Sequence, residues 1–95
     1  MEEHLIIFAK DMDTRVDGIT IRYLGMDNYN FYFSYNDDEG AKRASITRKY
    51  FEHKPHTAPI GDLLFRMEIY KENSLLLRYV GKRPAKLSDL EVQLG

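Results

Sequence analysis

The sequence predicts a mainly β fold: a small, single-domain antiparallel barrel or curved sheet of about six strands with a short C-terminal helix. Three observations lead to this prediction. Apolar side chains recur at every second position in several segments, which is the period of a strand. Clusters of Gly, Asp and Asn separate these segments, as in tight hairpin turns. A helix-capping pattern occurs only near the C-terminus.

The first strands are expected in the N-terminal half. His4–Lys10 is short and apolar on both faces, so we expect a buried strand, followed by a polar loop over Asp11–Arg15. Ile19–Gly25 alternates again and leads through Met26-Asp27-Asn28 into the aromatic segment Tyr29–Tyr35. These two alternating segments are predicted to form a hairpin.

The aromatic segment is the most distinctive part of the chain. Tyr29, Phe31, Phe33 and Tyr35 would all project from one face of a strand. We expect this face to pack in the core, with the tyrosine hydroxyls at its ends reaching water. If the face were exposed, it could instead stack the bases of a nucleic acid. The sequence alone leaves this choice open.

The C-terminal half supplies the remaining elements. Ala41–Phe51 fits a strand better than a helix, although both patterns are present. Pro55, Pro59 and Gly61 indicate a loop over His53–Gly61, and Asp62–Lys71 with Ser74–Gly81 predicts a second hairpin. Ser88 and Glu91 form a capping box, which predicts a short helix docked through Leu90 and Leu94.

Composition narrows the class of protein. The chain has 95 residues, which suits one domain over residues 1–95, and is 43% hydrophobic and 31% charged, which argues against disorder. It has no cysteine, no recognisable targeting segment and no apolar run near the roughly 18 residues of a membrane span, so a cytoplasmic location is expected. Residues 1–39 carry nine acids and three bases, and residues 40–95 carry six acids and eleven bases.

Catalytic and metal chemistry find little support. The glycines are scattered, no Gly-x-Ser-x-Gly motif occurs, and no cysteine is available as a nucleophile. His53 and His56 are the closest histidine pair, but Pro55 between them argues against a helical ligand pair. We therefore expect a protein that is not an enzyme and has no metal or cofactor.

The abundance of tyrosine and arginine favours a small protein-binding module of the adaptor or inhibitor type, because these residues dominate interface hot spots. The predicted binding residues face outward on the core interpretation: Tyr32, Arg48, Tyr50, Arg66 and Tyr70. The alternative is a single-stranded RNA- or DNA-binding protein, whose phosphate contacts would come from a basic cluster over residues 42–54 that includes Lys42, Arg43, Arg48 and Lys49. A homo-oligomeric component is a third hypothesis.

Overall fold

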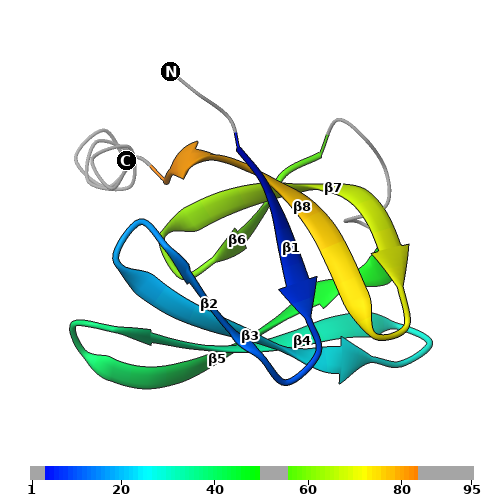
Figure 1. Ribbon diagram of the computed structural model, residues 1–95, viewed down its shortest axis with the longest axis horizontal. Coiled ribbons are helices and arrows are strands. Elements are labelled where there is room, and N and C mark those ends of the chain that lie inside the picture. Colours follow the sequence, from blue (N-terminus) through cyan, green and yellow to red (C-terminus); the bar gives the residue numbers. More distant parts are fainter. Residues whose placement is uncertain (1–3, 50–55, 84–95) are drawn as a thin grey trace, which may run out of the picture.

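The computed structural model describes residues 4–49 and 56–83, which form two four-stranded antiparallel sheets (Figure 1). The first sheet has the order β1-β8-β7-β6, with bounds His4–Ala9, Ser74–Lys82, Leu63–Lys71 and Ala58–Ile60. The second has the order β2-β3-β4-β5, with bounds Asp13–Val16, Ile19–Met26, Asn30–Asp37 and Gly40–Thr47. The prediction of a mainly β protein is confirmed.

The core lies between the two sheets and is rich in aromatic side chains. Phe8, on β1, packs edge-on against Phe33 of the other sheet, with ring centroids 6.5 Å apart. Phe8 also packs edge-on against Phe65 at 5.7 Å. All three rings are fully buried, so the contact between the sheets is made by close-packed aromatic rings in favourable edge-to-face geometry.

Both predicted hairpins are present. β3 pairs with β4, and β7 pairs with β8. β4 is also paired with β5, so the aromatic segment forms a central strand, as its neighbours in the sequence indicated. Phe31 and Phe33 are fully buried, which confirms the core interpretation for these two, whereas Tyr29 is 73% exposed just before the strand begins.

The strand count and the closure of the sheet differ from the prediction. Residues 4–49 and 56–83 already contain eight strands rather than the predicted six or so. The two additional strands lie in predicted loops: β2 overlaps the loop Asp11–Arg15 and extends beyond it, and β6 lies within the loop His53–Gly61. The strands do not close into one barrel: in the described part of the chain, the only β-bridge between the sheets joins Lys10 to Tyr23. The predicted C-terminal helix lies outside the described residues.

The prediction that His4–Lys10 is a doubly buried strand is wrong. Among the residues that the structure describes, β1 is an edge strand that pairs only with β8, and Phe8 is its one buried residue. Leu5 and Ile7 are 53% and 68% exposed on the outer face of the sheet. A continuous apolar run is typical of a central parallel strand, but here it belongs to an antiparallel edge.

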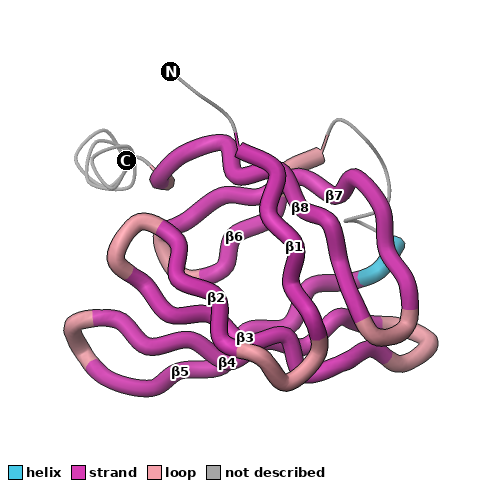
Figure 2. Tube along the Cα trace, in the orientation of Figure 1, coloured by secondary structure: helices cyan, strands magenta, loops and turns pink. Residues whose placement is uncertain are grey.

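The ambiguous segment Ala41–Phe51 is a strand as far as Thr47, and the backbone is helical at Arg48 and Lys49 (Figure 2). A bulge in β7 changes the predicted orientation of Tyr70. Met67 pairs with Leu77 and Ile69 with Leu76, so one extra residue is inserted and the alternation reverses. As a result Ile69 is exposed, and Tyr70 packs edge-on against Phe31 at 5.5 Å.

Candidate binding surface

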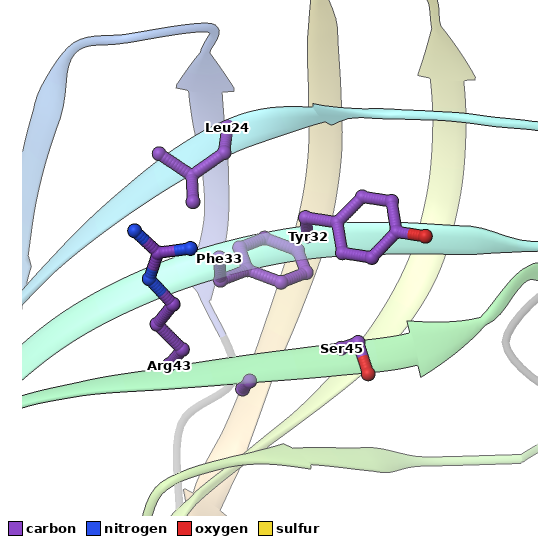
Figure 3. A pocket seen from close by; sticks show the side chains of 6 residues that line it. Leu24, Tyr32, Phe33, Arg43 and Ser45 are labelled. Carbon is purple, nitrogen blue, oxygen red and sulfur yellow. The ribbon is translucent and has the colours of Figure 1, made fainter.

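A hollow of about 450 Å³ opens on the outer face of the sheet formed by β3, β4 and β5. Leu24, Tyr32 and Arg43 reach it from these three neighbouring strands, with Ser45 at its side (Figure 3). The remaining lining comes from Phe33 and Ala44. We refer to this feature as the Tyr32–Arg43 hollow. It combines an apolar wall, a phenol and a guanidinium, which are the groups that anchor protein interfaces.

The register of the strands positions these side chains. Tyr32 is paired with Ser45, so the two project from the same face of the sheet. On the other side Tyr32 is opposite Gly25, next to a register shift between Tyr23 and Gly25 that leaves Leu24 as the extra residue. The bulge thus supplies the hollow with a half-buried leucine beside the tyrosine.

The Tyr32 hydroxyl is fixed by the β3–β4 turn. It donates a hydrogen bond to Asp27 Oδ2 at 2.5 Å, while Asp27 Oδ1 accepts from the backbone amides of Tyr29 and Asn30, both at 2.8 Å. These three donors stabilise the carboxylate and lower the pKa of Asp27, with the Tyr32 hydroxyl making the largest contribution. The ring of Tyr32 is therefore held in one orientation before any ligand arrives.

Arg48 and Tyr70 form a second group at the same turn. Arg48 Nη1 donates to the Asp27 carbonyl at 2.9 Å, and Nη2 donates to the Tyr70 hydroxyl at 3.2 Å. The guanidinium carbon also lies 5.4 Å from the centroid of the Tyr70 ring, within range of a cation–π interaction. Both predicted site residues thus join β7 to the β3–β4 turn, with Arg48 Nη1, Arg48 Nη2 and the Tyr70 hydroxyl engaged in hydrogen bonds within the chain.

The neighbouring cations Lys42 and Arg43 lie in different environments. Lys42 contacts Asp37 Oδ2 at 3.2 Å and Glu39 Oε1 at 2.6 Å, and these hydrogen bonds raise its pKa. Arg43 is exposed, and its side chain has no hydrogen bond or ion pair within the described part of the chain. Since successive strand residues point to opposite faces, only Arg43 faces the hollow.

The other predicted binding residues lie elsewhere. Arg66 is on the outer face of the β1-β8-β7-β6 sheet, directly opposite Arg78, and its Nε is buried without a hydrogen-bond partner. Lys49 is exposed just after β5. Tyr50 falls outside the described residues. The structure therefore brings Tyr32 and Arg43 to one hollow and Arg48 and Tyr70 to the adjacent turn, but it does not unite the whole predicted set.

Comparison with known proteins adds no relative. No family model, curated protein or solved structure matches the chain. Within residues 4–49 and 56–83, no group of three or more His, Asp or Glu side chains is arranged to hold a metal ion. The same residues include no helix with the length and apolar character needed to cross a membrane. A functional assignment therefore has to come from the surface of the chain itself.

Sequence reasoning missed several exposed or hollow-lining residues. Leu24 and Ser45 line the hollow but carry no distinctive sequence signal, because alternation places them like any outward strand residue. The exposed side chains Leu5 and Ile7 were expected to be buried because both faces of their segment are apolar, and the alternation that put Tyr70 on the outside implied an inward Ile69. Only the position of β1 at an edge and the bulge in β7 reveal that they face solvent.

Proposed function

We propose that this chain is a protein-binding module whose contact surface is the Tyr32–Arg43 hollow. The observation that carries the proposal is that an exposed arginine, Arg43, lines the same hollow as Tyr32, whose hydroxyl is already held by Asp27. A partner would lose little conformational entropy in ordering Tyr32, since the hydrogen bond at its hydroxyl has fixed the ring. No feature of the hollow supports a catalytic role.

The chemistry of the hollow defines the partner. A carboxylate can pair with Arg43 through two parallel hydrogen bonds, and an aliphatic or aromatic side chain can lie against Leu24 and the ring of Tyr32. We therefore propose a partner segment that places an acidic residue next to a large apolar one. Ser45 can donate or accept one further hydrogen bond at the side of the hollow.

The alternative function, binding of single-stranded RNA or DNA, has less support. Phe31 and Phe33 are fully buried and offer no ring face to a base. Of the basic cluster, Lys42 is paired with two acids, and Arg48 is held by the β3–β4 turn and Tyr70. Fluorescence anisotropy with labelled oligonucleotides at low salt tests this function, which requires binding that weakens steeply as salt is added.

A displayed library of random peptides tests the protein-binding proposal. We expect selection on the wild-type chain to enrich peptides with an acidic residue beside an apolar one. Arg43→Ala should weaken their binding by roughly tenfold or more, the loss typical of a hot-spot residue. The matched control is Lys42→Ala, which removes the same charge from the adjacent position and should change affinity by less than about twofold.

Two results would count against the proposal. One is a selection that yields no common motif. The other is an equal loss of affinity in both variants, because a general electrostatic effect does not distinguish Lys42 from Arg43. Far-UV circular dichroism of each variant confirms that the fold is retained before affinities are compared.

A further inference from the structure

The two sheets formed by residues 4–49 and 56–83 have four edges, and the edge strands differ in how well their own residues protect them. β6 has only three residues, with Pro59 in the middle, and β2 has four, including Asp13 and Arg15. β5 has two adjacent charged residues, Lys42 and Arg43, near its middle. β1 has six residues and contains no Pro, Lys, Arg, Asp or Glu. Short strands, prolines and charges are the usual means of preventing edge-to-edge pairing, and β1 has none of them.

The hydrogen bonds of β1 determine which of its backbone groups are available. The Lys10 amide donates to the Asn73 carbonyl at 2.9 Å, and β1 is antiparallel to β8. Because alternate residues of a strand bond to alternate sides, the backbone groups of Leu5 and Ile7 point away from β8. Within the described part of the chain, no backbone hydrogen bond to Leu5 or Ile7 lies outside the strand ladders.

The side chains at this edge are apolar as well. Leu5 and Ile7 are 53% and 68% exposed on the outer face, and Ile69, at 55%, lies two strands further in. Ile7, Ile69 and Leu76 line one shallow hollow on this face, so the apolar surface continues from the edge onto the sheet. Contiguous exposed apolar surface of this kind marks an interaction site in a folded protein.

We propose that β1 pairs antiparallel with β1 of a second copy of this chain, joining two four-stranded sheets into one of eight strands. The strand is self-complementary about Ile6: the pairing sets Leu5 of each copy opposite Ile7 of the other, and both residues direct their backbone groups to the shared edge.

Such a dimer has two-fold symmetry, with the same surface used by both copies. It leaves the Tyr32–Arg43 hollow free, because the hollow is on the outer face of the other sheet. The inference is therefore independent of the proposed function: Arg43→Ala should leave self-association unchanged, and a failure of either proposal can be recognised separately.

Sedimentation equilibrium over a wide series of concentrations tests the pairing. The wild-type chain should form a dimer. Ile7→Lys should raise the dimer dissociation constant by roughly tenfold or more, because the two introduced positive charges would occupy diagonal neighbouring positions across the shared edge and repel each other. Ile7→Pro should also raise the dimer dissociation constant, because proline lacks the amide N–H that points to the shared edge. The hydrogen bonds between β1 and β8 do not involve this N–H and should remain. Ile69→Lys is the matched control: it makes the same change on the same face away from the edge, and the dimer should persist.

Three results would overturn the proposal. The first is a monomeric wild-type chain at every concentration. The second is a dimer that survives both substitutions at Ile7. The third is a dimer that is lost in Ile69→Lys and kept in Ile7→Pro, since this pattern means that two outer faces stack and no edge pairs. Circular dichroism of each variant verifies that the strands are still formed.

Discussion

Phe33→Ala tests the two-sheet core most directly. Phe33 is fully buried and contacts Phe8 across the sheets and Tyr23 beside it, with ring centroids 6.5 and 5.6 Å apart. Truncating a buried phenylalanine costs about 3–5 kcal/mol, and both aromatic contacts are lost with it. We therefore expect the free energy of unfolding to fall by about 4 kcal/mol, out of the roughly 5–15 kcal/mol usual for a domain of this size.

The matched control is Tyr29→Ala. Tyr29 belongs to the same alternating aromatic set but is 73% exposed, so its truncation should change stability by less than about 0.5 kcal/mol. Urea unfolding followed by far-UV circular dichroism measures the free energy of unfolding of both variants. In a thermal melt, Phe33→Ala should lower Tm by about 15–30 °C. Similar losses for the two variants would refute the distinction between a buried and an exposed end of the aromatic segment.

Two further predictions concern the backbone and the pH dependence. Gly61 has a φ of +62°, and a Cβ built there would lie 2.9 Å from a ring carbon of Tyr35. Gly61→Ala should therefore reduce the free energy of unfolding by about 1–3 kcal/mol, and by more than Gly18→Ala, where φ is also positive but the space is open; a greater loss at Gly18 would contradict the clash. Burial, followed by the hydrogen bond to Asp17, raises the pKa of Tyr79 to about 12 from its usual value of 10. Because the folded pKa is the higher one, this stabilisation is complete below pH 10 and is lost as the pH rises toward 12. Chemical unfolding at a series of pH values should show that the free energy of unfolding falls less steeply above pH 10 in Tyr79→Phe than in the wild-type chain. An equally steep fall in the variant would show that the Tyr79 phenol does not cause the loss of stability.

Local signals in the sequence predicted the hairpins well. The turn at Asp27 depends on a side chain that bonds to amides two and three residues ahead, which is a property of the residue type and its position. Similarly, Gly40 directly follows the acidic residues Asp37, Asp38 and Glu39 and begins β5, and its φ of +114° is in the region that favours glycine. Residue types and spacing were therefore sufficient to predict the pairing of strands that follow each other along the chain.

Non-local pairing was not readable from the sequence. β1 pairs with β8 across most of the chain, and nothing in the composition of His4–Ala9 distinguishes an edge strand from a central one. β2 and β6 are short, and their polar residues or proline resemble loops. The edge position of β1 and the formation of β2 and β6 both depend on which strands lie next to them in the sheet. The pattern of residues along the chain does not give this information.

The candidate site was predicted in part for the same reason. Tyr32 was correctly expected on the face opposite Phe31 and Phe33, because alternation holds within β4. Tyr70 was placed on the wrong face, since the bulge after Met67 reverses the alternation in β7. Lys42 is paired with acids and Arg43 is exposed because of where the carboxylates lie in the folded chain. Sequence patterns alone do not predict these positions.

The pairing of β1 with β8 also has a consequence for the order of folding. His4 is paired with Tyr79, so β1 cannot join its ladder until the chain as far as Tyr79 has left the ribosome. The β2-β3-β4-β5 sheet is built from consecutive strands within residues 13–47 and can form earlier. Contacts between distant segments slow folding because a long loop must close first. During that interval the apolar β1 is without its partner, and the nascent chain is most prone to aggregation.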